Sequence, residues 1–279
     1  MLKRSRRDNG DGDGDDLTYE DYLGLDRLLT AQHPIADPPH HDELLFIIQH
    51  QTAELWTRLL LHEMAHLQSL LRDDDLIGAT RGLERVYAVQ AQMIGQWSVI
   101  ATLTPESFTE FRPVLGDTSG FQSAQLRAWE FKLGNKRPDY LKHYHWSAQR
   151  ELLERALNEP TLYDDFLRFL LRTGHPVPES CLDRLYSGDQ EPDQTVVAAL
   201  RRIYEDCDRH RAEYEMAERL VELEERHQLW RFRHARTVRR IIGERPGTGG
   251  KGVPYLADLV GRPLFPELFA ARDVIGTGS

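Results

Sequence analysis

The sequence predicts an all-α protein, a bundle of helices with one functional loop near its C-terminal end. From Leu17 onward the apolar residues recur at helical spacing almost everywhere. No stretch shows a convincing strand pattern, and no internal repeat divides the chain. A glycine-rich segment, residues 243–252, follows the last long helical stretch. These observations favour layers of helices around one core.

The first half of the chain contains the clearest helices. Residues 17–31 carry their leucines on one side, and a loop at residues 33–39 follows, in which Pro38 and Pro39 permit only a turn or a helix start. Residues 41–71 are apolar nearly all round, which predicts a central, buried helix. The leucines of the first stretch are Leu23, Leu25, Leu28 and Leu29.

Further helices are expected along the rest of the chain. One covers about residues 78–103, Thr104 and Pro105 begin the next by N-cap chemistry, and residues 116–121 interrupt the pattern before it resumes at 122–133. The region 135–190 is the least regular and is treated as an insert, with helical segments at 148–157 and 162–172. Residues 193–243 form a long charged helical region, which we expect to hold two helices meeting near residues 226–230.

Composition limits the domain organisation and the class of partner. The 279 residues, 40% of them hydrophobic, suffice for a single domain over residues 17–279, and the charged, glycine-containing residues 1–16 predict a disordered tail. A net charge of −10 argues against nucleic-acid binding. The sequence lacks an apolar run long enough for a membrane span, the first 16 residues lack the apolar segment of a signal peptide, and only Cys181 and Cys207 are present. A cytoplasmic protein in a reducing compartment is therefore expected.

One motif of general chemical interest lies in the second helix. His62, Glu63 and His66 form an HExxH sequence, which on a helix can bind zinc with the glutamate as general base, and Glu84 is a possible third ligand. Twelve histidines in a helical chain also produce pairs at this spacing by chance. The strand-bearing domain that usually accompanies this motif is not predicted here.

Two further histidines allow alternative interpretations. His50 lies in the most hydrophobic helix, where a histidine is more often a hydrogen-bonded core residue than a ligand. His234 lies among aromatic residues and arginines, which fits either a basic amphipathic helix face or an axial ligand of haem iron with cations near the propionates. The residues alone do not decide between these alternatives.

Four separated groups of residues carry a family resemblance. The first joins Leu17-Thr18-Tyr19, Tyr22-Leu23 and Pro38-Pro39-His40-His41-Asp42-Glu43. The second is Phe46-Ile47-Ile48-Gln49-His50-Gln51-Thr52 with Glu54-Leu55-Trp56. The third is Phe111-Arg112, Leu115-Gly116 and Ser119-Gly120-Phe121-Gln122-Ser123, and the fourth is Phe232-Arg233-His234, Thr237-Val238, Ile241-Ile242-Gly243 and Gly247-Thr248-Gly249-Gly250. In this order they resemble the tryptophan 2,3-dioxygenase family, over residues 17–138 and 228–256.

The resemblance implies a helix bundle enclosing a pocket for haem b, with the glycine-rich loop closing it. It implies L-tryptophan or a close derivative as substrate and O₂ as co-substrate, with N-formylkynurenine as product, in tryptophan catabolism along the kynurenine pathway. A homotetramer is implied as well. The HExxH sequence is then a continuation of the distal helix, and a zinc site becomes the minor alternative.

The resemblance also assigns roles to individual residues. His234 would be the axial iron ligand, His50 would accept a hydrogen bond from the indole N–H, and Arg112 would pair with the substrate carboxylate. Thr248 would close over the substrate's ammonium and carboxylate groups. Apolar and small residues would surround the indole and the haem edge, and others would come from a neighbouring subunit. The first set is Phe46, Phe108 and Leu115 against the indole and Ser119 and Gly120 at the haem edge; the second is Tyr19, Tyr22 and Leu23.

Two departures from the family pattern leave alternatives open. After Gly250 the loop reads Lys251-Gly252 and is one residue shorter than expected, and Thr118 stands where serine is common. A relative from secondary metabolism that inserts one oxygen into a tryptophan derivative is therefore an alternative enzyme. A non-catalytic haem-binding or haem-sensing protein is the alternative from another class.

Overall fold

The regular structure of the described residues is entirely helical, as predicted. The computed structural model describes residues 17–144, 148–182, 191–247 and 253–276, and no strand occurs among them. Residues 1–16 and Thr248 lie outside this part of the chain. None of the described helices is long and apolar enough to cross a bilayer.

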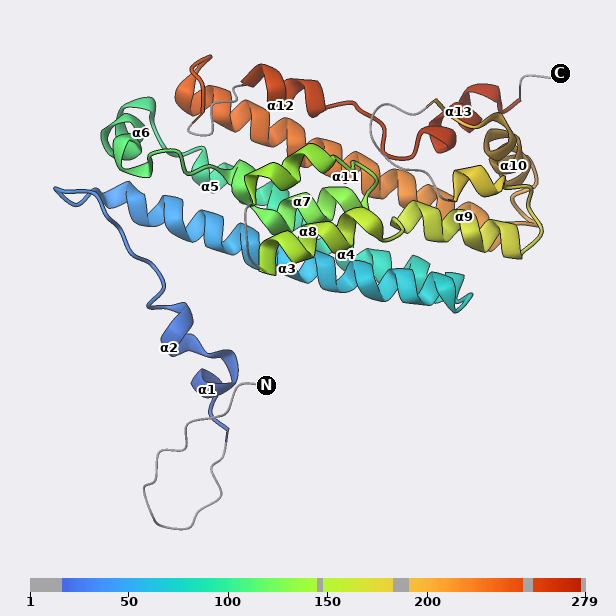
Figure 1. The fold of residues 1–279 in the computed structure, drawn as a ribbon, viewed down its shortest axis with the longest axis horizontal. Coiled ribbons are helices and arrows are strands. Elements are labelled where there is room, and N and C mark those ends of the chain that lie inside the picture. Colours follow the sequence, from blue (N-terminus) through green and yellow to red (C-terminus); the bar gives the residue numbers. More distant parts are fainter. Residues whose placement is uncertain (1–16, 145–147, 183–190, 248–252, 277–279) are drawn as a thin grey trace, which may run out of the picture.

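Three long helices form the centre of the molecule. They are α3 (His41–Arg72), α4 (Leu76–Gly95) and α11 (Arg211–Ile242), and α4 packs against both of the others (Figure 1). Apolar side chains at helical spacing face this common interior, since burying one stripe of each helix is what holds such a bundle together. Leu60, Met64 and Leu67 of α3, Leu83 of α4 and Leu220 and Leu223 of α11 are fully buried there.

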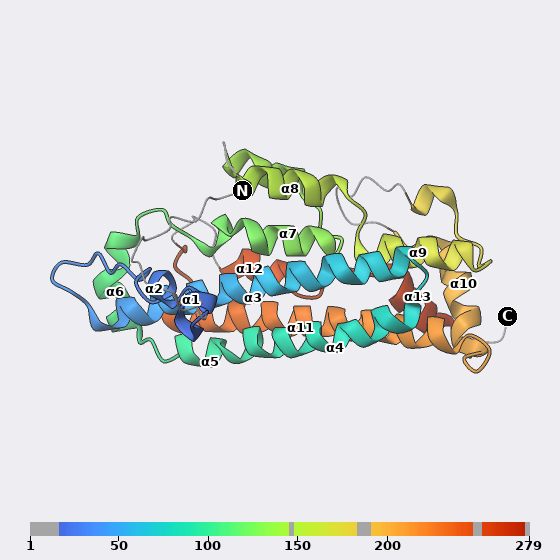
Figure 2. The same cartoon turned by 90° about the horizontal axis from the view of Figure 1, so that it is seen from below.

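Shorter helices cover the long ones. Helix α7 (Ala124–Lys132) packs on α3, and α8 (Ala148–Asn158) packs on α7, which makes an outer layer on one side of the bundle (Figure 2). At one end α9 (Leu162–Arg172), α10 (Gln194–Glu205) and α13 (Pro266–Val274) close the core. Helix α12 (Val253–Leu259) lies against α11.

The opposite end of the bundle holds short helices between α4 and α7. These are α5 (Trp97–Ile100) and α6 (Pro105–Phe111), followed by 3₁₀ turns. As expected, Thr104 caps α6, because its hydroxyl accepts a bond of 3.1 Å from the Ser107 N–H. Gly116 has a φ of +53°, which ends the first turn. The 3₁₀ turns in the described chain are Arg112–Leu115, Gly120–Gln122, Pro138–His143 and Glu179–Cys181.

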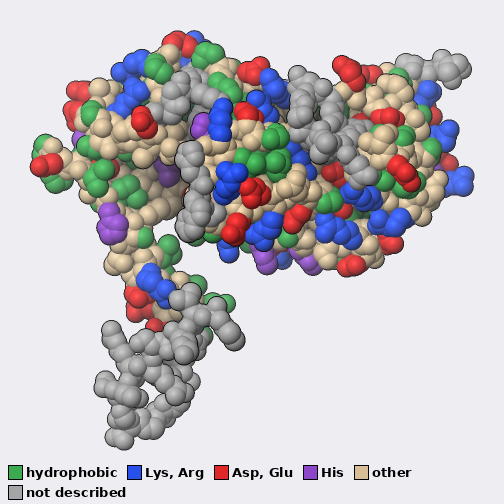
Figure 3. Space-filling view, viewed as in Figure 1, with side chains coloured by type: hydrophobic (Ala, Val, Ile, Leu, Met, Phe, Trp, Pro, Cys, Tyr) green, Lys and Arg blue, Asp and Glu red, His purple; other side chains and the backbone are tan. Residues whose placement is uncertain are grey.

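The N-terminal stretch differs from its prediction. Residues 17–31 form two short helices, α1 (Tyr19–Leu23) and α2 (Leu25–Leu28), because Gly24 adopts a left-handed conformation between them. They project from the body of the molecule (Figures 1 and 3), and their leucines do not pack into the core. Tyr19 and Tyr22 are each 74% exposed. On the face of the body seen in Figure 3, acidic and basic side chains are interspersed.

The predicted break near residues 226–230 is wrong. Helix α11 runs through this region without interruption, and the chain turns instead between Glu205 and Arg211. The charged and aromatic residues that interrupt the apolar pattern are buried against α7: His227 accepts a bond of 3.4 Å from the Trp129 indole N–H, and Arg231 pairs with Glu130. Polar contacts between helices replace apolar ones there, so sequence periodicity alone gave a false boundary.

Candidate functional site

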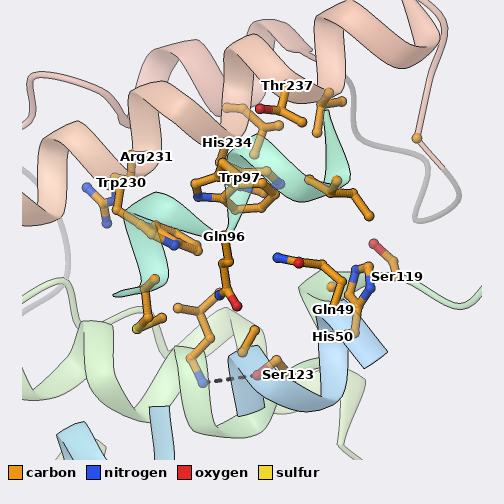
Figure 4. A pocket seen from close by; sticks show the side chains of 18 of the residues that line it. Gln49, His50, Gln96, Trp97, Ser119, Ser123, Trp230, Arg231, His234 and Thr237 are labelled. Atoms are coloured by element: carbon orange, nitrogen blue, oxygen red, sulfur yellow. Dashed lines mark hydrogen bonds between the residues drawn. The ribbon is translucent and has the colours of Figure 1, made fainter. Parts of the chain in front are cut away.

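A cavity between α3, α5, α7 and α11 brings together residues that are far apart in the sequence (Figure 4). Most of its lining is apolar, and a few polar groups converge on it, as in ligand-binding pockets generally. Seven of the predicted site residues line this one cavity. They are Phe46, His50, Phe108, Arg112, Ser119, Gly120 and His234.

His234 projects into the cavity from α11. Its ring stacks on Trp97 of α5 at a centroid distance of 4.7 Å and an interplanar angle of 11°. The ring of Trp230, one turn earlier on α11, has its centroid 5.5 Å from that of His234. Burial lowers the pKa of His234 to about 4, with Arg127 and His50 contributing in the same direction. The imidazole is therefore neutral at pH 7, which is the form that binds a metal. Neither of its nitrogens has a hydrogen-bond partner among the described residues.

His50 enters the same cavity from α3. Its Nδ1 lies 2.7 Å from the Phe46 carbonyl oxygen one turn earlier, so this nitrogen carries the proton and donates it. Desolvation lowers the pKa of His50, although the Phe46 carbonyl and the Glu54 carboxylate oppose this shift. A neutral ring protonated at Nδ1 leaves Nε2 as a hydrogen-bond acceptor.

Aromatic rings surround the cavity beside His50. The centroid of the Phe46 ring lies 4.2 Å from that of His50 and 5.9 Å from that of Phe108, and both phenylalanines line the cavity. Leu115, predicted to act with them, packs against the neighbouring cluster around Phe108 and Phe111 and is not among the lining residues. This end of the cavity offers flat apolar surfaces suited to an aromatic ring.

Arg112 lies at the side of the cavity next to the glycine-rich loop. It is half-buried, and its Nη2 donates a bond of 2.6 Å to the Pro246 carbonyl oxygen. Gly247, which follows Pro246, lines the cavity as well. The guanidinium thus keeps further N–H donors beyond the one used by Pro246.

The predicted contributors from a neighbouring subunit lie apart from the cavity of their own chain. Tyr19, Tyr22 and Leu23 are on α1, outside the body of the molecule (Figure 1). Exposed aromatic side chains on a projecting arm are free to contact another molecule.

A buried ionic group on the cavity wall was not found from the sequence. Glu130 accepts bonds from Arg127 at 2.5 Å and from Arg231 at 3.1 Å, and Arg231 also donates to the Leu259 carbonyl oxygen at 3.0 Å. All three line the cavity, and each is at most 5% exposed. The i, i+3 spacing of Arg127 and Glu130 on an apolar helix is the signal that indicates such a pair.

Several buried polar atoms beside the cavity have no partner within the described chain. These are Oε1 of Gln96, Nε1 of Trp97, Nε1 of Trp230 and Nε of Arg231. Buried polar groups are nearly always satisfied in folded proteins, so a group of unsatisfied atoms around one cavity indicates a polar or charged ligand.

The HExxH sequence does not form the site of a zinc hydrolase. His62 and His66 lie on the exposed side of α3, whereas Glu63 is buried and pairs with Arg85 at 3.1 Å. Glu84, the possible third ligand, pairs with Arg219 at 2.6 Å. The glutamate is therefore turned away from the histidine pair and occupied by a cation, which contradicts the alternative of a zinc hydrolase at this motif.

Known proteins resemble the chain over almost its whole length. The family model described as tryptophan 2,3-dioxygenase matches residues 5–182 and 183–275. A protein of Kineococcus radiotolerans named tryptophan 2,3-dioxygenase is 48% identical over 264 residues, covering 94% of this chain and 92% of the relative. Proteins of the same name from Myxococcus xanthus and Xanthomonas oryzae are 51% and 47% identical, over 91% and 94% of this chain and 88% and 89% of the relatives.

Proposed function

The chain belongs to the tryptophan 2,3-dioxygenase family, and we propose that it opens the indole ring of L-tryptophan with O₂ on haem b, yielding N-formylkynurenine. The observation that carries this proposal is the cavity itself. It brings together a half-buried neutral imidazole from α11, a second imidazole from α3, two phenylalanine rings and an arginine. This set supplies a group for the iron, a group for the indole N–H and a group for a carboxylate.

The residues around the cavity fit haem. His234 offers a neutral nitrogen without a hydrogen-bond partner in the described chain, and Arg127 and Arg231 place two buried cations around the single carboxylate of Glu130. The unsatisfied indole N–H groups of Trp97 and Trp230 add donors at the same wall. His234 would bind the haem iron, and these cations and donors would pair with the propionates. When bound, haem supplies the iron centre at which O₂ is activated.

His50 is suited to orient the indole. Because its Nδ1–H is donated to the Phe46 carbonyl, Nε2 is available to accept a hydrogen bond from the indole N–H. Phe46 and Phe108 would contact the indole faces, with Leu115 approaching them when substrate is bound. Ser119 and Gly120, which line the cavity, would lie along the haem edge.

Arg112 and the glycine-rich loop would hold the amino-acid end of the substrate. The planar guanidinium can pair with a carboxylate through two parallel N–H bonds, for which an ammonium group is a poor substitute. Its present bond to Pro246 connects it to the loop that continues to Thr248, the residue proposed to contact the substrate's ammonium and carboxylate groups. Holding both ends of tryptophan fixes C2 and C3 of the indole in the position where reaction takes place.

We propose that the cavity is completed in a homotetramer. Tyr19, Tyr22 and Leu23 are exposed on the projecting α1 and α2 arm, and in an assembly they would reach the cavity of a neighbouring copy. They would cover the apolar pocket and exclude water from it.

Product analysis tests the proposed reaction. Reduced haem-loaded protein, L-tryptophan and ¹⁸O₂ should give a product that contains both labelled oxygen atoms, since the C2–C3 bond is cleaved and each carbon receives one oxygen. Incorporation of a single oxygen would favour the alternative of a mono-oxygenating relative. A Soret band without any turnover of tryptophan would instead identify a haem-binding or sensing protein.

A further inference from the structure

A second group of ligand-type side chains lies at the end of the bundle opposite α6. His175 follows α9, and His210 and Glu213 lie at the start of α11 (Figure 1). One nitrogen of each imidazole and one carboxylate oxygen all lie within 4.8 Å of one another. The His175 and His210 rings are 5.0 Å apart, and Nε2 of His175 is 3.8 Å from Oε1 of Glu213.

The backbone holds His175 in place. The His175 N–H donates to the Leu170 carbonyl oxygen at 2.9 Å, and the Gly174 N–H donates to the Leu171 carbonyl oxygen at 3.1 Å. With Gly174 at a φ of +92°, these are the two bonds of a Schellman motif at the end of α9. The position of His175 is therefore set by the termination of a helix that is buried in the core.

The other two residues share one turn of α11. His210 precedes the helix, and its carbonyl oxygen accepts from the Tyr214 N–H at 2.9 Å. Glu213 follows three positions later in the first turn of the helix, and the two side chains converge on the same point. Metal-binding helical bundles also combine a histidine and a glutamate three positions apart, although there the glutamate comes first.

The spacing of these polar atoms exceeds that of hydrogen bonds and approaches that of metal ligands. A separation of 3.8 Å is too long for a hydrogen bond between His175 and Glu213. Glu213 instead acts on His175 as a long-range charge partner that favours the protonated imidazole, and the side chains of the two residues are only 10% and 17% exposed. Around a tetrahedral zinc ion with bonds of about 2.0–2.1 Å, ligand atoms lie about 3.3 Å apart. Movements of roughly 0.3 to 0.8 Å in each side chain, which rotations about the side-chain bonds can supply, would bring separations of 3.8 to 4.8 Å to that value.

We propose that His175, His210 and Glu213 bind a zinc-type divalent cation that joins the end of α9 to the start of α11. Two imidazoles and one carboxylate suit zinc, whereas calcium and magnesium prefer sites built from oxygen ligands alone. A water molecule would complete the coordination. This inference concerns a site at the other end of α11 from His234 and does not depend on the proposed function.

Arg202, a neighbouring residue, allows a substitution that should raise the affinity for zinc. The Arg202 guanidinium of α10 lies near enough to His175 to lower the pKa of that imidazole, in addition to the larger effects of burial and of His210. The same positive charge must oppose a bound cation. Replacing Arg202 by a neutral residue should therefore tighten zinc binding, while replacing a ligand should weaken it.

Zinc titration of the haem-loaded protein tests the proposal. All proteins should carry His66→Ala, because His62 and His66 form an exposed i, i+4 pair that can bind zinc by itself. Bound zinc is measured by elemental analysis after chelator treatment and re-addition of zinc. We expect one zinc per chain, a loss of affinity of more than about tenfold in His175→Ala and Glu213→Gln, and a gain in Arg202→Gln. Glu215→Gln is the matched control, since Glu215 lies two positions away and pairs with Arg211 at 2.9 Å.

Two further measurements keep the result interpretable. An unchanged far-ultraviolet circular dichroism spectrum in each variant shows that the protein is folded, and X-ray absorption at the zinc edge identifies the ligands. Zinc affinities that are equal in the ligand variants and in the control would overturn the proposal. A zinc spectrum without imidazole nitrogens would overturn it as well.

Discussion

Glu224 should make the free energy of unfolding depend on pH in a direction unusual for a carboxylate. This side chain of α11 is 4% exposed, and its Oε2 accepts bonds of 2.9 Å from both the Leu264 and Phe265 N–H groups. Burial raises its pKa from 4.5 to about 7, even though the two N–H bonds and Arg231 act in the opposite direction. The folded protein therefore holds this proton more tightly than the unfolded chain does.

The sign and size of the effect follow from this difference. Stability from the raised pKa is fully present below pH 4.5 and is lost as the pH rises toward 7, because deprotonation then favours the unfolded chain. At about 1.4 kcal/mol for each pH unit, the loss approaches roughly 3 kcal/mol above pH 7. Oε2 accepts both backbone bonds, so the proton resides on Oε1.

Glu224→Gln imitates the protonated carboxyl, since an amide oxygen can accept both bonds while the NH₂ replaces the O–H. Urea unfolding followed by circular dichroism should give nearly equal stability for variant and wild type at pH 5. At pH 8.5 the variant should be more stable by roughly 3 kcal/mol. Glu225→Gln removes an exposed charge that is the smallest of the causes acting on the Glu224 pKa, so it should keep most of the wild-type pH dependence. Parallel pH profiles for wild type and Glu224→Gln would refute the reasoning.

Three substitutions test the roles proposed in the cavity. His234→Ala should abolish stable haem incorporation, measured from the Soret band and the iron content; normal haem content would disprove the assignment of the axial ligand. His50→Ala should retain haem and lose roughly twofold to tenfold in kcat/KM, the equivalent of one net hydrogen bond, whereas loss of haem would mean that the two faces are reversed. Arg112→Lys should weaken tryptophan binding, measured by spectroscopic titration, by roughly 10- to 100-fold through loss of one charged hydrogen bond. Unchanged affinity in that variant would exclude Arg112 as the carboxylate anchor.

Much of the fold could be predicted because its helices are apolar at regular spacing. The helix expected at residues 41–71 is α3 (His41–Arg72), and those expected at 148–157 and 162–172 are α8 and α9. The predicted helix boundaries were wrong where backbone conformation or polar contacts, and not apolar spacing, determine the structure. Gly24 divides the first stretch by adopting a left-handed conformation, and α11 continues through residues whose polar groups are buried in contacts with another helix.

The candidate site could be predicted only in part, and for a physical reason. Family resemblance identified His234, His50 and Arg112 because their immediate sequence neighbours form recognisable strings. Glu130 of α7 and Arg231 of α11 lie about 100 positions apart in the sequence, and nothing in either segment alone shows that they meet. Together with Arg127, these residues are buried and form a wall of the cavity with two positive charges and one negative charge. Their arrangement becomes visible only when α7 and α11 are placed around the same cavity.

Helix α11 connects the two proposed sites and also keeps them chemically separate. His210 and His234 are 24 positions apart on or beside one continuous helix, which at 1.5 Å per residue is roughly 36 Å. The electric field of a cation bound at His210 would be screened over a much shorter distance than this, since the Debye length is about 8 Å at physiological ionic strength. Between them, Glu224 and Gln228 hold the backbone at residues 261–265, and Arg231 holds Leu259, which lines the cavity. Any influence of zinc on the cavity must therefore pass through the position of α11, and it should appear in the free energy of unfolding and not in the electrostatics of His234.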